Sequence, residues 1–260
     1  MNKSIRTERS TGLDGETLMV IVQSPKRLAR IAGVFYLLLG VFGGFAQGFL
    51  YPRLYVAGDA TATAANLTSN PDLVRFGVVA DLLGQIFFVL VALALYMLLK
   101  HVNVGVARAM VALVIIAAAI TSLNVVFELG GLQIATGAVD ASSLGAEGSN
   151  ALVLLMLDAQ RHGILVAQLF FGLWLTPLAY LAYKSGLFPK VLAIVLVLAT
   201  VSYLIDLFVA FLLPEVSAGI HPYFGIMPAV AEIGMVLFLL IVGVLSPRVA
   251  PLREEVRAPV

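Results

Sequence analysis

The stretch LDAQRHGILVAQLFFGLWLTPLAYLAYK, Leu157–Lys184, is a long apolar run that begins with three ionisable side chains. It is long enough to cross a bilayer as a helix, since about 20 apolar residues suffice. Asp158, Arg161 and His162 fall within its first two turns. Such groups are costly in hydrocarbon, so they normally face a protein interior or a wet cavity. The stretch therefore predicts a central transmembrane helix that contacts most other spans near Asp158–His162.

The composition of the whole chain agrees with a membrane protein. Of its 260 residues, 61% are hydrophobic and only 12% are charged, whereas soluble domains are nearer half apolar and a quarter charged. The chain has no cysteine, which excludes disulfides, thiolate nucleophiles and cysteine-bound iron or zinc. The sequence has no basic cluster with interleaved aromatic residues, the pattern of nucleic-acid binding. We therefore predict one compact membrane domain whose main partner is the lipid bilayer.

Six apolar runs reach the length of a spanning helix, so the predicted fold class is all-α, a polytopic bundle of six transmembrane helices. We place these helices near residues 31–52, 73–99, 107–135, 152–183, 188–213 and 224–246. They belong to one transmembrane domain, 25–246. We expect residues 1–24 and 247–260, which are polar, to form flexible cytoplasmic tails.

The distribution of Lys and Arg predicts the orientation, because positive charge collects on the cytoplasmic side of a membrane protein. With the N-terminus inside, Arg53, Arg75 and Arg161 fall on the outer side or in the outer parts of the spans. The other 13 of the 16 Lys and Arg residues fall on the inner side. An odd number of spans would mix the two sets. We therefore expect both termini to be cytoplasmic.

Several residues predict where helices start, bend and stop. Asp59 can cap a short outer helix, and Pro177 and Pro228 can each kink a span, because proline lacks a backbone donor. Residues 137–150 are small, polar and rich in Gly, and residues 213–225 contain two prolines. We expect both segments to be outer loops.

Three glycines of the first span recur at four-residue spacing, at Gly40, Gly44 and Gly48. Such a ridge of small residues lets another helix approach closely. We expect it to pack against a helix of the same bundle, with homo-oligomerisation through the ridge as the alternative.

The charged residues of the spans fall in one layer. Counted from the predicted helix ends, seven lie in the outer half of the membrane: Asp81, Glu128, Asp158, Arg161, His162, Asp206 and Glu232. Gln85, Asn124 and Gln168 lie on the same helices and complete the set of candidate ligand-binding residues. The set holds five carboxylates and one guanidinium, so we expect Arg161 to be the main internal counter-ion.

Three parts of the sequence resemble the bacterial membrane proteins grouped as domain-of-unknown-function family 4386. They are SPKRLARIAGVFYLLLG at 24–40, AGDATATAANL at 57–67, and the run from Leu157 to Phe208. The resemblance covers Arg27 to Gly243 and is most specific after Asp158, with FFGL at 170–173, SGLFPK at 185–190 and YLID at 203–206. It implies a six-helix protein of the bacterial plasma (inner) membrane, and it implies no reaction.

Three interpretations of the polar layer are open. The first is an outward-facing polar intramembrane pocket that binds or transports a cation or a small cationic or amphipathic molecule. The second is a structural polar network in a membrane scaffold or interaction protein. The third is an intramembrane metal-dependent hydrolase with Asp158, His162 and Asp206 as ligands of a divalent metal. No serine-nucleophile elbow, phosphate loop or dinucleotide fingerprint occurs, so we assign no catalytic residue and no firm cofactor.

Overall fold

The computed structural model describes residues 24–245, so the two predicted tails lie outside the described residues apart from Ser24. Six helices are long and apolar enough to cross a membrane, as predicted, and we call them spans 1 to 6. They are Pro25–Leu54, Pro71–Leu99, Val104–Ala135, Ser142–Ser185, Lys190–Leu212 and Gly219–Ile241. The elements of the described range are all helical: α2 (Pro25–Gly43), the π-helix η1 (Gly44–Leu50), α3 (Tyr51–Leu54), α4 (Ala60–Ser69), α5 (Pro71–Leu99), α6 (Val104–Ala135), the 3₁₀-helix η2 (Ser142–Leu144), α7 (Gly145–Leu173), α8 (Leu175–Ser185), α9 (Lys190–Leu212), α10 (Pro214–Phe224) and α11 (Ile226–Ile241).

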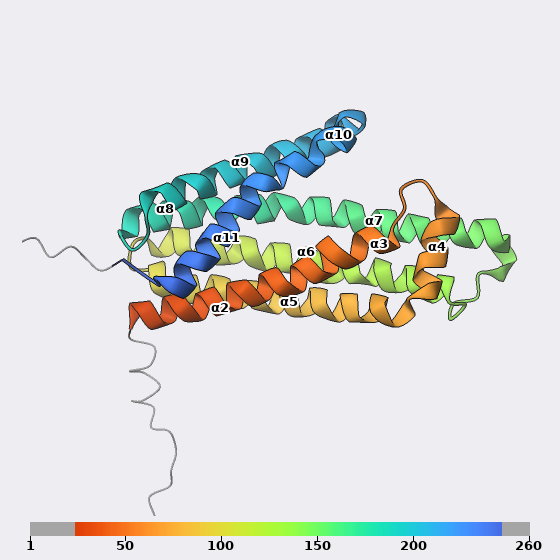
Figure 1. Ribbon diagram of the computed structural model, residues 1–260, viewed down its shortest axis with the longest axis horizontal. Helices are drawn as coiled ribbons and strands as arrows, with labels where there is room; N and C mark the ends of the chain where they lie inside the picture. The colour runs from red at the N-terminus through yellow and green to blue at the C-terminus, as the bar shows by residue number, and fades with distance from the viewer. Residues whose placement is uncertain (1–23, 246–260) are drawn as a thin grey trace, which may run out of the picture.

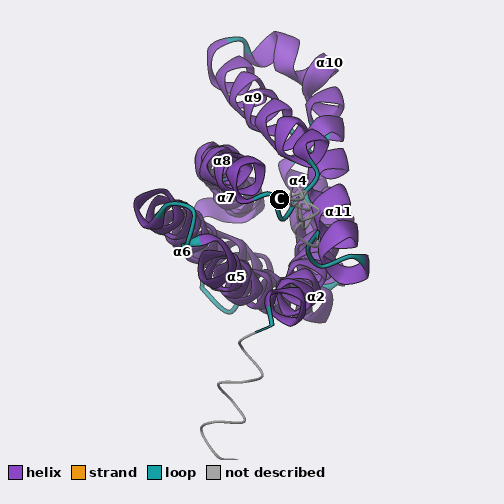
Figure 2. Cartoon of the chain, turned by 90° about the vertical axis from the view of Figure 1, so that its left-hand side faces the viewer, coloured by secondary structure: helices purple, strands orange, loops and turns teal. Residues whose placement is uncertain are grey.

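The six spans form a closed ring in which each span packs against the next along the chain. α2 packs on α5, α5 on α6, α6 on α7, α7 on α9 and α9 on α11, and α11 returns to α2. Figure 2 shows this arrangement along the bundle axis. α8 continues span 4 and packs against α9, α6, α7 and α5. A sequential ring of this kind needs only short connections between antiparallel neighbours.

The two ends of the bundle differ. The proximal end carries Ser24, Leu245 and the short links from α5 to α6 and from α8 to α9, whereas the distal end carries α4, η2 and α10 (Figure 1). α11 crosses α2 toward the proximal end and diverges from it on the way to α10 (Figure 1). Among the described elements, α10 packs only against α9 and α11. The ring is therefore closed proximally and spread apart distally, between spans 1 and 6.

Close approach of spans 1 and 6 at the proximal end depends on two glycines. A Cβ on Gly33 would lie 3.0 Å from the Leu239 Cβ, and a Cβ on Gly243 would lie 3.6 Å from the Lys26 Cα. Gly243 also has a φ of 80°, which residues with a side chain rarely adopt. The first and last helices therefore meet backbone to backbone.

Two spans are broken at a proline, as predicted. Pro177 has no N–H to offer the carbonyl of Leu173, and α7 ends at Leu173. Pro228 has no N–H to offer the carbonyl of Phe224, the residue at which α10 ends. The outer loop predicted after span 5 is wrong, because that segment forms α10. Its first residue is Pro214, and proline is favoured in the first turn of a helix.

The other predicted features of the distal end are partly confirmed. Asp59 caps α4, because its Oδ1 accepts a hydrogen bond of 2.8 Å from the Ala62 N–H. α7 begins at Gly145, inside the loop predicted at 137–150. Span 4 is therefore longer than the apolar run that predicted it.

The predicted packing of the Gly40, Gly44 and Gly48 ridge within the bundle is wrong. A Cβ added at any of the three would meet nothing within 4 Å. The cause is the divergence of α11, the partner of α2, beyond the crossing at Gly33. Homo-oligomerisation through the ridge stays a prediction.

A continuous apolar core fills the proximal half of the ring. α2, α5, α6, α8, α9 and α11 contribute to it, and its fully buried members include Ala29, Leu95, Met110, Leu178 and Met235. Many bulky apolar side chains on the outside are exposed, among them Phe76, Leu123 and Leu212. Large exposed apolar surfaces mark contact with a membrane or another protein, which fits a multi-pass membrane protein.

Candidate functional site

The charged start of span 4 lies at the surface of the bundle. Arg161 and His162 are exposed, and Arg161 forms no ion pair within residues 24–245. The Arg161 guanidinium carbon lies 5.7 Å from the centre of the Tyr55 ring. The prediction that Arg161 is the main internal counter-ion is wrong, because α7 presents this side chain at the surface.

Span 4 is central through a different residue, Trp174. This side chain is 1% exposed and lies between α7 and α8. Its ring centre is 5.9 Å from that of Tyr36 in span 1 and 5.1 Å from that of Phe88 in span 2. Span 4 therefore contacts spans 1 and 2 in addition to its ring neighbours, spans 3 and 5, and the predicted meeting of most spans near Asp158–His162 is wrong.

Asp158 is held by a tyrosine from the end of span 1. The Tyr55 hydroxyl donates a hydrogen bond of 2.6 Å to Asp158 Oδ1, and the Tyr51 hydroxyl donates one of 2.8 Å to the neighbouring carbonyl of Leu157. Partial burial and the bonded Asp158 carboxylate raise the pKa of Tyr55, so its hydroxyl stays protonated and keeps donating. Asp158 thus fastens spans 1 and 4 together.

The predicted metal ligands are not assembled. In the described part of the chain, no group of three His, Cys, Asp or Glu side chains is placed to hold a metal ion. His162 Nδ1 lies 2.7 Å from the backbone oxygen of Asp158 rather than beside its carboxylate. Asp206 is bonded to Gln168, ten residues beyond Asp158 on α7, which corresponds to about 15 Å along the helix.

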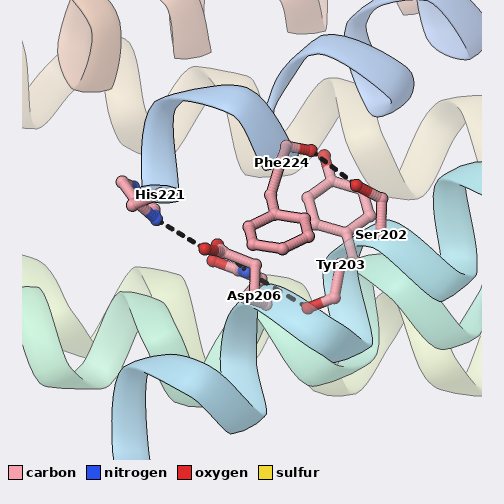
Figure 3. Close-up of polar contacts among 6 residues, drawn as sticks. Ser202, Tyr203, Asp206, His221 and Phe224 are labelled. Atoms are coloured by element: carbon pink, nitrogen blue, oxygen red, sulfur yellow. Dashed lines mark hydrogen bonds and ion pairs between the residues drawn. The ribbon is translucent and has the colours of Figure 1, made fainter. Parts of the chain in front are cut away.

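Asp206 lies in a polar cluster that joins spans 4 and 5 to α10. Gln168 Nε2 donates a hydrogen bond of 2.7 Å to Asp206 Oδ2, and His221 Nδ1 is 2.8 Å from Asp206 Oδ1. Figure 3 shows His221 reaching from α10 toward Asp206, beside the bond from the Ser202 hydroxyl to the Phe224 carbonyl. Asp206 is 4% exposed. His221 is absent from the predicted site residues because its segment was expected to be a loop.

Glu232 is held by two tyrosines from different spans. The Tyr36 hydroxyl donates a hydrogen bond of 3.0 Å to Glu232 Oε2, and the Tyr203 hydroxyl donates one of 2.9 Å to Oε1. The three residues link spans 1, 5 and 6. Neither tyrosine is among the predicted site residues, although Tyr203 lies one turn before Asp206 on the same helix.

Asp81 is held by a glutamine that the π-helix presents. Gln47 Nε2 donates a hydrogen bond of 2.7 Å to Asp81 Oδ2, and Gln47 lies inside η1. π-helical turns interrupt α-helices at functional sites more often than elsewhere. Pro52 lies two residues after the end of η1, and because it has no N–H for the carbonyl of Gly48 it is the sequence signal for a departure from regular α-helix in this span.

Asn124 and Glu128 pack on glycines of neighbouring spans. Asn124 Nδ2 donates a hydrogen bond of 3.3 Å to the Gln160 carbonyl, and a Cβ on Gly163 would overlap the side-chain amide of Asn124. Glu128 Oε1 would lie 3.8 Å from a Cβ on Gly77. These two candidates therefore sit at the interfaces of span 3 with spans 4 and 2.

Three of the candidates, Asp81, Gln85 and Glu232, line a cavity of about 340 Å³, which we call the acidic cavity. Its charged lining residues are Asp81 and Glu232, and no Lys, Arg or His lines it in the described part of the protein. Phe88, Phe171 and Trp174 supply apolar walls, and Gly40, Gly43 and Gly44 lie on the side of span 1. Gln85 Oε1 and Thr121 Oγ1 are buried without a hydrogen-bond partner among the described residues, and both residues line the cavity.

A second cavity of about 320 Å³, which we call the vestibule, lies toward α10. Arg161 and His221 line it, together with Gln160 and Gln168. Gln160 is 1% exposed, and its Oε1 also has no partner in the range 24–245. The vestibule and the acidic cavity share Gln47 and Ile164 as lining residues, so the two cavities are neighbours.

The fold and these cavities define a class, a multi-pass helical membrane protein with carboxylates held inside the distal half of its bundle. The profile of the family described as Domain of unknown function (DUF4386) matches residues 31–243. The chain belongs to this family, which confirms the resemblance. No curated protein and no solved structure matches the chain.

Proposed function

We propose that the protein binds a small cationic, partly apolar molecule in the acidic cavity. The proposal places the protein in the bacterial plasma membrane with both termini in the cytoplasm, so that the cavity is entered from the outer side. Basic residues support this orientation, because seven of the ten Lys and Arg residues within the described range lie at the proximal end: Lys26, Arg27, Arg30, Lys100, Arg108, Lys184 and Lys190.

The observation that carries the proposal is the excess of hydrogen-bond acceptors in the acidic cavity. The carboxylates of Asp81 and Glu232 line it together with the unpartnered oxygens of Gln85 and Thr121. Buried polar groups are nearly always hydrogen-bonded, so these acceptors favour a ligand that donates. An ammonium group donates three hydrogen bonds and carries the opposite charge.

The apolar walls of the cavity favour an organic amine over a bare metal ion. Phe88, Phe171 and Trp174 face it, and aromatic faces attract organic cations through their quadrupoles. A volume near 340 Å³ falls within the range of small-molecule sites, about 300–1,000 Å³. A metal ion would need a compact set of oxygen or nitrogen ligands, and the described residues supply no such group.

A closed structural network is the competing function. The hydrogen bonds from Gln47 to Asp81 and from the two tyrosines to Glu232 would also occur in such a network. The unpartnered Gln85 and Thr121 argue against it, because a network that only holds helices together leaves few polar atoms unpaired. Transport would further require a second conformation open at the proximal end, where the apolar core now lies.

The proposal is tested by ligand-dependent thermal stabilisation of the purified protein in mild detergent. Hexylamine should raise the melting temperature in a concentration-dependent manner, and hexanol and divalent metal salts should not. Asp81→Asn and Glu232→Gln should each abolish the amine effect, while Glu147→Gln, an exposed carboxylate on α7, should preserve it. No amine effect, or one that survives both cavity substitutions, would return the polar layer to the structural interpretation.

A further inference from the structure

The two neighbouring cavities carry opposite charge. The acidic cavity is lined by Asp81 and Glu232 and by no basic residue, whereas the vestibule is lined by Arg161 and His221 and by no carboxylate of the described chain. Gln47 and Ile164 line both cavities and mark the place where they adjoin. The site is therefore polarised, with its negative part among the spans and its positive part toward α10.

Arg161 carries the permanent positive charge of the vestibule, and its guanidinium is not engaged by ion pairs. It forms none within residues 24–245. Its neighbour is Tyr55, which it contacts at the ring and at the hydroxyl, and one hydroxyl cannot use all five N–H donors of a guanidinium. A guanidinium presents five donors in a planar fork that matches a carboxylate or a phosphate. An arginine placed on a transmembrane span usually has such a partner.

We propose that the ligand is zwitterionic, with an ammonium group in the acidic cavity and a carboxylate or phosphate group at Arg161 in the vestibule. This inference rests on the proposed function, to which it adds the chemical class of the ligand. Both charges of such a molecule are matched by the protein, and neither is left unpaired at membrane depth, where an unpaired charge is costly. His221 also lines the vestibule, where its Nδ1 is engaged by Asp206, so Arg161 is the group that receives the anion.

The same chemistry can reach the site from two sources. A free molecule enters through the distal end, past α10. The head group of a zwitterionic phospholipid enters from the side, because Gly40 and Gly44 line the acidic cavity, Gly40 is exposed, and α11 diverges from α2 at this level (Figure 1). Both sources supply an ammonium group and an anion in one molecule.

The experiment compares ω-amino carboxylates of two to eight carbons with alkylamines of the same length, by calorimetric titration of the full chain in nanodiscs of anionic phosphatidylglycerol. The best amino carboxylate should bind at least about tenfold more tightly than its alkylamine, since a charge-assisted hydrogen bond is worth that factor or more. Arg161→Gln should remove this advantage and leave alkylamine affinity within about twofold. Arg161 is exposed, so the variant should fold. Arg75→Gln, which alters an exposed arginine outside both cavities, should retain the advantage.

The outcomes separate the inference from the function on which it rests. If alkylamines bind through Asp81 and Glu232 but amino carboxylates of every length bind no more tightly, the ligand is a simple cation and the inference is overturned. A preference for amino carboxylates that persists in Arg161→Gln overturns it too. If neither class of compound binds, or both bind equally well to Asp81→Asn and Glu232→Gln, the proposed function fails as well.

A second arm identifies the source of the zwitterion. The titration is repeated in nanodiscs that contain phosphatidylethanolamine, whose head group carries both charges. Weaker binding of the amino carboxylate in these discs means that the lipid head group competes for the site, and equal binding means a free ligand. Both results support a zwitterionic ligand, provided that the dependence on Arg161 holds.

Discussion

The proximal and distal halves of the bundle are built from the same helices and differ in almost every physical respect. In the proximal half, small residues such as Ala29, Ala32 and Gly33 are buried and bring neighbouring helices into close contact around an apolar core. In the distal half, η1 and the break at Gly225 interrupt spans 1 and 6, whereas the break of span 4 at Trp174 borders the apolar core. The interruptions redirect the helices, and polar side chains and cavities occupy the space between them.

The comparison teaches that the polar site depends on backbone irregularity as well as on charged residues. Each interruption leaves carbonyl groups without their regular partner, and such backbone is tolerated at membrane depth only where protein or a cavity surrounds it. The proximal half supplies the rigid closure that fixes the positions of the distal segments. Four substitutions test this difference between the proximal and distal halves, in order of decreasing effect on the free energy of unfolding.

The largest effect is expected from Leu95→Ala in the proximal core. Leu95 is 0% exposed on α5, whereas Leu93 on the same helix is 43% exposed. Leu95→Ala should lower the free energy of unfolding by about 2–5 kcal/mol, and Leu93→Ala by no more than about 0.5 kcal/mol. Unfolding of the purified protein by dodecyl sulfate in mixed micelles measures both. Equal losses would mean that the ring-facing side of α5 has no special role.

A second test removes one donor from the carboxylate of span 6. Tyr203→Phe deletes the hydroxyl that bonds Glu232 Oε1 and should cost about 1.5–3 kcal/mol, the value for hydrogen bonds to charged groups. Tyr180→Phe is the matched control, because Tyr180 is 43% exposed on α8, and it should be neutral. A neutral Tyr203→Phe would show that Glu232 is not held by this bond.

Gly163→Ala tests the contact between spans 3 and 4. The added Cβ would overlap the buried amide of Asn124. Such overpacking typically lowers the free energy of unfolding by about 1–3 kcal/mol. Gly40→Ala introduces the same methyl group where nothing lies within 4 Å. It should be neutral or stabilising by up to about 1 kcal/mol, because alanine favours a helix more than glycine. The two melting temperatures should therefore move apart, and a parallel shift would contradict the assigned packing.

The smallest effect is expected at the distal surface. Asp59→Ala removes the cap on the Ala62 N–H and should destabilise α4 by about 1 kcal/mol. Faster amide hydrogen exchange confined to α4 would report this local loss. Asp72→Ala, which removes an exposed ion pair with Arg75, should leave exchange unchanged because such pairs contribute little.

The six spans, the cap at Asp59 and the breaks near Pro177 and Pro228 were predictable from the sequence, because each depends on local chemistry. The side of each helix that faces the bundle was not. Apart from a few polar residues, α5, α6 and α9 carry apolar side chains on every face, so the periodicity of apolar residues does not distinguish lipid from protein. On α7, Arg161 and His162 were placed inside the bundle because ionisable groups at membrane depth normally face protein.

The residues that complete the site follow from three-dimensional contacts that no local pattern encodes. Gln47 is presented by a π-helix, and Tyr36 and Tyr203 meet Glu232 only because spans 1, 5 and 6 converge. His221 required the recognition of α10 as a helix. Of the site, only the shared depth of the carboxylates along the helices could be read from the chain itself, since depth depends on residue counts and not on helix rotation.

The backbone contact between Lys26 and Gly243 makes the bundle cyclic in the topological sense. A permuted chain with a short linker from residue 245 to residue 24, and with new ends opened between Lys100 and Asn103, would keep every neighbouring pair of spans. It would begin with α6, which runs in the same direction as α2, so each helix would also keep its polarity. Proteins whose ends lie close together commonly tolerate such permutation. The order of the spans along this chain therefore records the order in which they are synthesised, and their packing would accept a different starting point.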